Sequence, residues 1–169
     1  EIEPGIIGGS GIIYLEGYLF DRPEAKAAFR QAAGLAIAAG RRVALTLSDA
    51  FCVDRHRAEF LDLIRQHVDI LFANESELKS LYQTATFEDA LARVRKDTRL
   101  AAVTRSEKGA VICEGERLVA VPAASSGQPV DTTGAGDLFA AGFLFGIATG
   151  RDLETAGRPG CLPPREILR

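Results

Sequence analysis

Residues 131–144 read DTTGAGDLFAAGFL and carry the strongest structural signal in the chain. The small residues Gly134, Ala135 and Gly136 come just before an apolar run that is typical of a buried helix, so the first turn of this helix is bare. Backbone N–H groups at a bare helix N-terminus have no intrahelical partner, and the helix dipole favours negative charge there. The pattern therefore predicts an anion hole at residues 134–136, for a phosphate or a developing oxyanion.

Asp137 lies at the mouth of this predicted anion hole. Its charge repels a resting phosphate, and proton abstraction from an attacking hydroxyl is the chemical role that explains an acid at this position. The alternative is a helix-capping acid that the dipole stabilises. The residues leave both roles of Asp137 open, and we interpret the stretch as a phosphoryl-transfer site. Asp131, six residues earlier, either positions this loop or a substrate hydroxyl, or forms a turn.

Two further motifs precede this stretch. Residues 74–77 read NESE and follow a predicted strand, at the start of a predicted helix. Residues 103–110 read VTRSEKGA and form a predicted turn after the next strand. Because open α/β sheets bind ligands at the C-terminal ends of parallel strands, both motifs lie where a site is expected.

The three motifs together resemble those of the PfkB family of sugar kinases, also called the ribokinase family, which includes the adenosine kinases. DTTGAGDLFAAGFL matches the family signature at every position, NESE resembles its N-x-x-E motif, and TRSEKG resembles its T-x-G-x-x-G nucleotide-binding turn. Residues 13–21 (IYLEGYLFD) and 43–57 (VALTLSDAFCVDRHR) are most similar to the bacterial adenosine kinase branch. The resemblance extends roughly from residue 10 to residue 157.

The resemblance implies a role for each motif. Asp137 is then the catalytic base, and Gly134, Ala135 and Gly136 form the anion hole. Asn74 and Glu77 serve the magnesium and phosphate environment, with Mg²⁺ held indirectly through water and nucleotide phosphates because it keeps much of its hydration shell. The alternative for Glu77 is a solvated carboxylate in the first turn of a helix.

The turn after residue 103 is implied to bind nucleotide through Thr104, Ser106 and Gly109. Thr104 is either a nucleotide contact or an ordinary hydroxyl at a strand end. Ser106 replaces the first glycine of the family motif, which reduces the backbone freedom at this position. Arg105 and Lys108 either contact phosphates or are solvated, and we leave them out of the predicted site.

Short apolar runs alternate with helical patterns along the chain, which predicts βαβ units and a mostly parallel sheet. We expect strands at residues 12–15, 43–47, 69–72 and 100–104, and helices at residues 23–39, 55–67 and 87–96. Hairpin-like pieces at 110–113 and 118–121 predict an antiparallel edge. Residues 123–128 are expected to form a loop before the 134–144 helix. The predicted fold class is α/β and ribokinase-like: a mostly parallel sheet flanked by helices, with a C-terminal antiparallel β-meander, as a partial domain.

We expect residues 1–157 to be the C-terminal part of a PfkB-type kinase domain and residues 158–169 to be a divergent Pro-rich tail. The tail contains Pro159, Pro163 and Pro164, which do not continue a helix. The family's N-terminal half, with its sugar-binding Gly-Gly motif and β-sheet lid, has no counterpart here, because residues 8–11 (GGSG) are too short to replace it. The absence of any Met fits a chain that begins mid-protein. We therefore expect this chain alone to be a poor or inactive catalyst.

Composition narrows the classes of function. The 169 residues carry a net charge of −3, with no basic stripe for nucleic acid and no apolar run long enough for a membrane span. The three cysteines have no C-x-x-C spacing, so we expect neither zinc nor disulfides and a cytoplasmic location. G-x-G-x-x-G and G-x-x-x-x-G-K-[ST] are both absent, which argues against a Rossmann dehydrogenase and a P-loop ATPase.

The predicted function is ATP-dependent phosphorylation of a primary hydroxyl on a nucleoside or sugar, with adenosine as the first acceptor to consider. Ribose, fructose and a ketodeoxy sugar acid remain as alternative acceptors. A non-catalytic nucleotide-binding module is an alternative from another class. The expected partners are small molecules, namely ATP with Mg²⁺ and the acceptor; nucleic acid and membranes are not expected, and a homodimer is left open.

Overall fold

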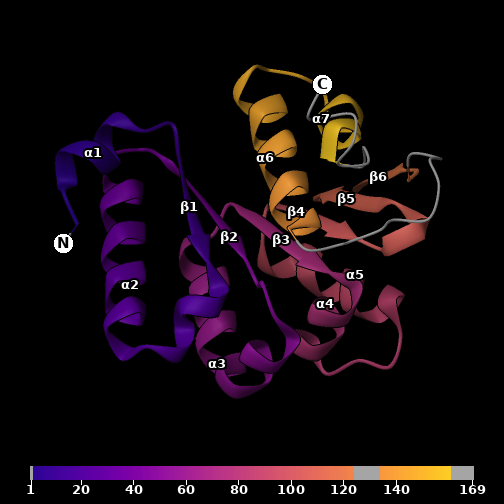
Figure 1. Ribbon diagram of the computed structural model, residues 1–169, viewed down its shortest axis with the longest axis horizontal. Helices are drawn as coiled ribbons and strands as arrows, with labels where there is room; N and C mark the ends of the chain where they lie inside the picture. Colours follow the sequence, from indigo (N-terminus) through magenta and orange to yellow (C-terminus); the bar gives the residue numbers. More distant parts are fainter. Residues whose placement is uncertain (1, 124–133, 161–169) are drawn as a thin grey trace.

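The computed structural model describes residues 2–123 and 134–160. A six-stranded sheet in the order β1-β2-β3-β4-β5-β6 forms its centre (Figure 1). Strands β1 to β4 are parallel, and β5 and β6 are antiparallel. Their bounds are β1 Ile12–Glu16, β2 Arg42–Thr46, β3 Ile70–Asn74, β4 Leu100–Thr104, β5 Ala110–Glu114 and β6 Arg117–Val121. The predicted fold class is confirmed, including the antiparallel edge.

Helices cover both faces of this sheet (Figure 1). One face is covered by α2, α3, α4 and α5, and the other by α6 and α7. The bounds are α1 Pro4–Gly9, α2 Pro23–Ala38, α3 Ala50–His67, α4 Glu75–Tyr82, α5 Phe87–Asp97, α6 Ala135–Ala148 and α7 Leu153–Gly160, with short 3-10 helices η1 Gly17–Asp21 and η2 Ser106–Lys108. Within the described ranges, no helix has the length and apolarity that a membrane crossing requires.

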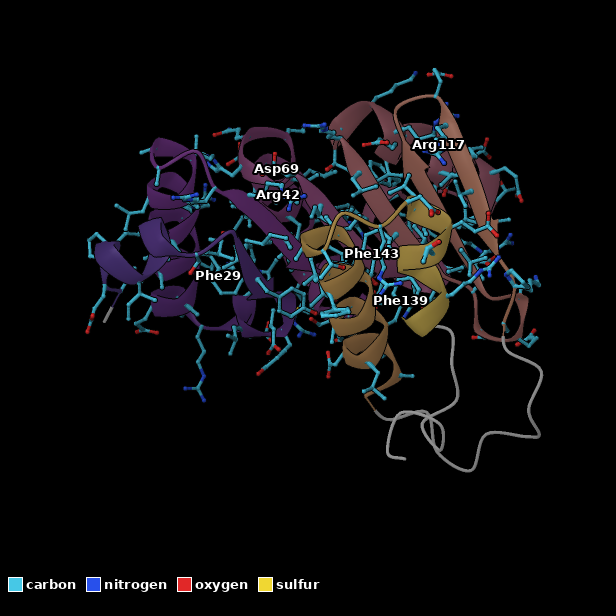
Figure 2. The ribbon with its side chains drawn as sticks, turned by 90° about the horizontal axis from the view of Figure 1, so that it is seen from above. Phe29, Arg42, Asp69, Arg117, Phe139 and Phe143 are labelled. Atoms are coloured by element: carbon cyan, nitrogen blue, oxygen red, sulfur yellow. The ribbon has the colours of Figure 1, made fainter. Side chains whose placement is uncertain are left out.

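Two hydrophobic cores form because alternate strand residues point to opposite faces. Val43 and Leu45 of β2 join the core under α2–α5, and Ala44 between them joins the core under α6 and α7. In the second core, the Phe72 ring of β3 meets Phe139 and Phe143 of α6 edge-on, with centroids 6.3 and 5.7 Å away. Both α6 phenylalanines can be followed in Figure 2. These contacts hold the first turns of α6 against the middle of the sheet.

Helix α3 begins at Ala50, five residues before the predicted start at Arg55, so the prediction was wrong there. The Asp49 side chain caps the helix by accepting hydrogen bonds from Phe51 N (3.3 Å) and Cys52 N (2.9 Å). His56 has non-helical backbone angles (φ −121°, ψ 21°), which place a kink inside the helix. This kink breaks the 3.6-residue period, so only the second part of the helix is evident from hydrophobic spacing.

Helix α7 runs to Gly160, so the expectation that the prolines of this region do not continue a helix was wrong for Pro159. Leu153 and Ala156 are buried and dock α7 into the second core. A Cβ on Gly146 of α6 would lie only 2.6 Å from Ala156 Cβ, so the two helices are in close contact. The rest of the predicted tail lies outside the described residues, as do residues 124–128 of the predicted loop and Asp131.

Candidate functional site

The C-terminal ends of the four parallel strands meet at one edge of the sheet. Glu16 of β1 is the register partner of Thr46 in β2, and Asn74 of β3 is the partner of Thr104 in β4. Open α/β sheets bind ligands at this edge. The structure therefore places two of the predicted site residues, Asn74 and Thr104, side by side on adjacent strands.

Asn74 and Glu77 form a capping box at the start of α4. Asn74 Oδ1 accepts a hydrogen bond from Glu77 N (2.8 Å), and the Glu77 carboxylate accepts from Asn74 N (2.9 Å) and Asn74 Nδ2 (2.7 Å). Glu77 is only 6% exposed, so the alternative of a solvated carboxylate is wrong. Burial raises its pKa, and the negative charge of Asp49 adds to this effect. Both carboxylate oxygens are already engaged, which fits a role toward Mg²⁺ through water rather than as a direct ligand.

The turn from Thr104 to Gly109 contains two residues in the left-handed region. Ser106 has φ +50° and Gly109 has φ +81°. Serine at the family's glycine position thus adopts the conformation for which glycine is normally used. A Cβ on Gly109 would lie 2.0 Å from the Val121 carbonyl oxygen, so only glycine fits there. The turn is closed by hydrogen bonds from Arg105 N to Gly109 O (2.7 Å) and from Gly109 N to Ser106 O (3.0 Å).

Within the described residues, the start of α6 is bare, as predicted. Gly134 is the N-cap residue, with φ +75°, and no side chain of the described ranges caps the helix there. The first hydrogen bond of this helix runs from Leu138 N to Gly134 O (3.0 Å), so the N–H groups of Ala135, Gly136 and Asp137 have no intrahelical partner. Asp137 is exposed in the first turn. This arrangement can accept an anion and leaves a carboxylate open to solvent beside it.

Tyr14 of β1 packs edge-on against Phe72 of β3, with ring centroids 6.1 Å apart. Its hydroxyl is buried without a hydrogen-bond partner in the part of the chain that the structure describes. Burial, opposed by the nearby Thr46 side chain and aided by the charges of Asp137, Glu16 and Glu77, raises the pKa of Tyr14 to about 12. Three carboxylates from β1, α4 and α6 therefore lie within Coulombic range of one phenol. No local pattern could have identified this proximity, because Tyr14 and Asp137 are far apart in sequence.

The predicted nucleotide turn and the predicted anion hole are not in direct polar contact. Among the described residues, no hydrogen bond or ion pair joins residues 104–109 to residues 134–137. The structure thus assembles Asn74, Glu77 and Thr104 directly, and the contact of Phe139 with Phe72 holds the first turn of α6, which contains Asp137, near the C-terminal end of β3.

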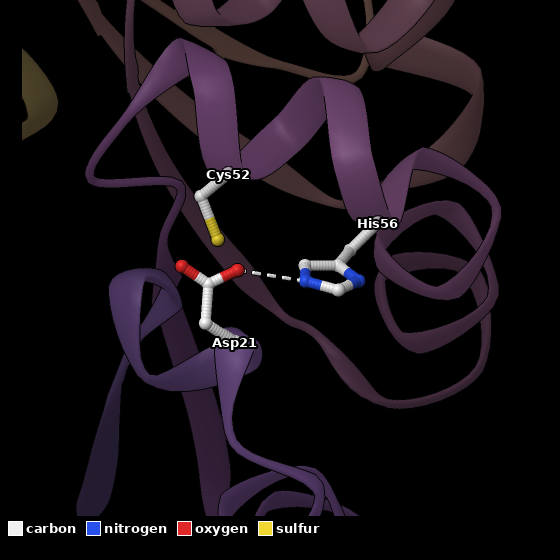
Figure 3. Close-up of side chains that lie close together, drawn as sticks. All are labelled: Asp21, Cys52 and His56. Carbon is white, nitrogen blue, oxygen red and sulfur yellow. Dashed lines mark hydrogen bonds and ion pairs between the residues drawn. The ribbon is translucent and has the colours of Figure 1, made fainter.

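Asp21, Cys52 and His56 form a second cluster, near the start of α3 (Figure 3). Their potential ligand atoms lie within 4.8 Å of one another, an arrangement that cysteine and histidine spacing did not predict. His56 Nε2 is 2.9 Å from Asp21 Oδ1, and Lys26 Nζ is 3.1 Å from His56 Nδ1. Because an ammonium group can only donate, Nδ1 accepts and Nε2–H donates to Asp21.

Positive charges surround this cluster. Arg55 donates to both Asp21 oxygens (3.0 and 2.7 Å), and Lys26 pairs with Glu59 at 2.5 Å. Both oxygens of Asp21 and both nitrogens of His56 are therefore in use. A cation would have to displace an arginine, so we interpret the cluster as an ionic network that joins η1, α2 and α3.

Because of the ionic network, we expect the free energy of unfolding to vary with pH in the acid range. Hydrogen bonds from Arg55 and His56 hold the pKa of Asp21 below its usual value of 3.8. A lowered folded-state pKa stabilises the protein above the unfolded value, and this stabilisation is lost as the pH falls toward the folded value. We expect the urea midpoint to fall less steeply below pH 4 in Arg55→Gln than in the parent. Arg158→Gln, which removes an exposed pair in α7, should follow the parent curve, and an identical slope for Arg55→Gln would contradict the assignment.

A surface hollow of about 550 Å³ lies at the opposite edge of the sheet. Val68, Asp69 and Thr98, which precede β3 and β4, line part of it. Parallel strands bind ligands at their C-terminal ends, where the turns that follow them converge. We therefore assign the functional site to the edge that carries Asn74, Thr104 and Asp137.

The chain is similar in sequence and structure to several known kinases. The chain is 52% identical to adenosine kinase from Sinorhizobium meliloti, with a TM-score of 0.93 over 95% of this chain and 50% of that one. It is 34% identical over 135 residues to a cytidine kinase from Thermococcus kodakarensis, covering 77% of this chain and 48% of the relative. The ribokinase of Arabidopsis thaliana, solved with ribose and ATP, is 26% identical, with a TM-score of 0.71 over 96% of this chain and 56% of that one.

The chain thus spans about half the length of each of these relatives. The model of the pfkB family carbohydrate kinases matches residues 6–162, a range that contains all three motifs of the strand-end site. This chain belongs to the pfkB family of carbohydrate kinases.

Proposed function

We propose that the protein containing this chain transfers the γ-phosphoryl group of ATP to a primary hydroxyl of a nucleoside or sugar. The observation that carries this proposal is the bare start of α6, where Asp137 lies exposed beside three N–H groups without intrahelical partners. An anion hole next to a free carboxylate suits an alcohol nucleophile and a phosphate electrophile. Family membership supports the same reaction class.

In the proposed reaction, Asp137 takes the proton of the acceptor hydroxyl as its oxygen attacks the γ-phosphorus, and ADP leaves. The N–H groups of residues 134–137 stabilise the negative charge on the transferring phosphoryl group. Bound Mg²⁺ would neutralise charge on the nucleotide phosphates. Thr104, Ser106 and Gly109 are proposed to contact the nucleotide.

We propose adenosine as the acceptor, on the basis of the 52% identity to the S. meliloti enzyme. Relatives named for cytidine and ribose show that members of the family differ in acceptor. The relatives are about twice as long as the matched region, so about half of each relative lies outside the segment that it shares with this chain. Ribose, fructose and a ketodeoxy sugar acid remain the alternatives.

The test is ADP release from Mg-ATP with adenosine, ribose and fructose offered in turn. Two proteins are compared: this chain alone, and this chain joined to the N-terminal half of the S. meliloti enzyme. We expect the joined protein to release ADP with adenosine and this chain alone to release little. If ADP is released with ribose or fructose and not with adenosine, that sugar replaces adenosine as the proposed acceptor. Nucleotide binding without turnover in both proteins would favour the alternative function, a non-catalytic nucleotide-binding module.

Glu77 provides a test of the proposed magnesium role. Glu77→Gln keeps one acceptor for Asn74 and removes the charge, whereas Glu77→Ala also removes the capping box. We expect Glu77→Gln to weaken the Mg²⁺-dependent part of ATP binding about 10- to 100-fold, the usual effect of losing an outer-shell partner of a metal. Glu77→Ala should in addition lower the free energy of unfolding by about 1–3 kcal/mol.

Calorimetric titration of ATP with and without Mg²⁺ measures the first effect, and urea unfolding measures the second. Asp152→Asn is the matched control, because Asp152 accepts hydrogen bonds from Thr155 at the start of α7, which carries none of the predicted site residues. If the Mg²⁺ dependence of ATP affinity is the same in Glu77→Gln as in the parent, Glu77 has no role toward Mg²⁺ and serves only to cap α4.

A further inference from the structure

Arg105 is held at three points in the turn that follows β4. Its backbone N–H donates to Gly109 O at 2.7 Å, and its side-chain Nε donates to Glu75 Oε2 at 2.8 Å. The guanidinium carbon lies 3.9 Å from the centre of the Phe87 ring. The side chain is only 19% exposed, so it is neither solvated nor extended toward a ligand.

These contacts come from two helix starts. Glu75 is the first residue of α4 and follows Asn74 directly, and Phe87 is the first residue of α5 and is 4% exposed. The Arg105 hydrogen bond and charge lower the pKa of Glu75, which therefore stays ionised well below neutral pH. The pair thus ties the turn to the same helix start that carries the capping box.

The same turn contains a strained residue. Ser106 adopts φ +50°, a conformation that costs a non-glycine residue free energy and persists only where surrounding contacts enforce it. The hydrogen bonds that close the turn, from Lys108 N to Arg105 O (3.0 Å) and from Gly109 N to Ser106 O (3.0 Å), begin or end within one residue of Arg105. Fixing the Arg105 side chain therefore restrains the backbone on the N-terminal side of Ser106.

We propose that Arg105 is a positioning residue for nucleotide binding: clamped between Glu75 and the Phe87 ring, it holds the Ser106–Gly109 turn in its strained conformation and in register with Asn74 and Glu77. It does not contact phosphate itself. The clamp compensates for the serine at position 106, where a glycine would adopt the same backbone without strain. The nucleotide part of this inference rests on the proposed function, but the clamp itself does not.

The first experiment measures amide hydrogen exchange in the chain without nucleotide. We expect Arg105→Ala to speed exchange at Lys108 and Gly109 about tenfold, because the ion pair and the cation–π contact are both lost. Arg105→Lys keeps the charge but not the planar stacking, and should give an intermediate rate. Arg95→Ala is the matched control, because it removes a comparable pair with Glu116 at the β5–β6 turn and should leave these two amides unchanged.

The second experiment measures Mg-ADP binding by calorimetry. If the turn is displaced in a folded protein, the Kd for Mg-ADP rises and the number of Mg-ADP molecules bound per chain is unchanged. If part of the protein is unfolded, that number falls. We expect the first result for Arg105→Ala and for Glu75→Gln, with the double variant no weaker than Arg105→Ala alone because both changes break one clamp. Parent-like binding by Glu75→Gln would show that the ion pair does not position the turn.

The two experiments separate this inference from the proposed function. A joined parent protein that binds no nucleotide would contradict the proposed function, and the exchange rates of this chain would still decide the clamp. Parent-like exchange at Lys108 and Gly109 in Arg105→Ala, together with weakened Mg-ADP binding, would make Arg105 a direct ligand and overturn the proposal. Parent-like exchange together with parent-like binding would overturn it as well.

Discussion

Asp137→Asn is expected to lower kcat about 100- to 10,000-fold in the joined protein, with nucleotide affinity little changed. The amide cannot accept the proton of the acceptor hydroxyl, while its size and its place in the first turn of α6 are preserved. Asparagine is also a good residue at a helix N-terminus, so the fold should remain intact. ADP release under saturating Mg-ATP and adenosine measures the effect.

The matched control is Asp152→Asn. Asp152 caps α7 by accepting hydrogen bonds from Thr155 N (3.0 Å) and Thr155 Oγ1 (2.7 Å), so it is a helix-start acid with a purely structural role. We expect this variant to keep the parent kcat. An Asp137→Asn protein as active as its parent would show that Asp137 also serves only the helix, and the proposed base would have to be another residue.

Gly109→Ala is expected to give the largest loss of stability among the substitutions considered. The added Cβ would lie 2.0 Å from Val121 O, 2.5 Å from Ala123 N and 2.7 Å from Pro122 C, all of them backbone atoms that cannot rotate away. The left-handed φ of +81° adds strain. Together these effects should lower the free energy of unfolding by roughly 3 kcal/mol or more. Urea unfolding measures the loss.

Gly115→Ala separates the clash from the backbone strain. Gly115 has φ +55° in the β5–β6 turn, and a Cβ there would meet nothing within 4 Å. Its substitution should cost about 1–2 kcal/mol from conformation alone. Equal losses in the two variants would mean that the β4–β5 turn moves away from Val121 without difficulty. In that case Gly109 could not be the residue that holds the turn against β6.

Local signals were enough to predict most elements. Strand β4 was expected at residues 100–104 and occupies Leu100–Thr104, and α2 begins at Pro23 as expected. Strand β4 is a continuous apolar run, and α2 begins with Pro23 and is followed by Gly40, so neighbouring residues specify both elements. Helix α3 was only half predicted, because the kink at His56 interrupts its period and its true start depends on the Asp49 cap.

The sequence by itself determined the family motifs, their order and the bare start of α6, because each depends on residues a few positions apart. Only the tertiary structure decided what surrounds them. It engaged Glu77 with Asn74, clamped Arg105 between Glu75 and Phe87, and buried the Tyr14 hydroxyl within Coulombic range of Asp137. Burial and side-chain pairing at this edge of the sheet bring together residues that are distant in sequence. No local pattern encodes these contacts, because they form only when the strands lie in register and α6 docks on β3.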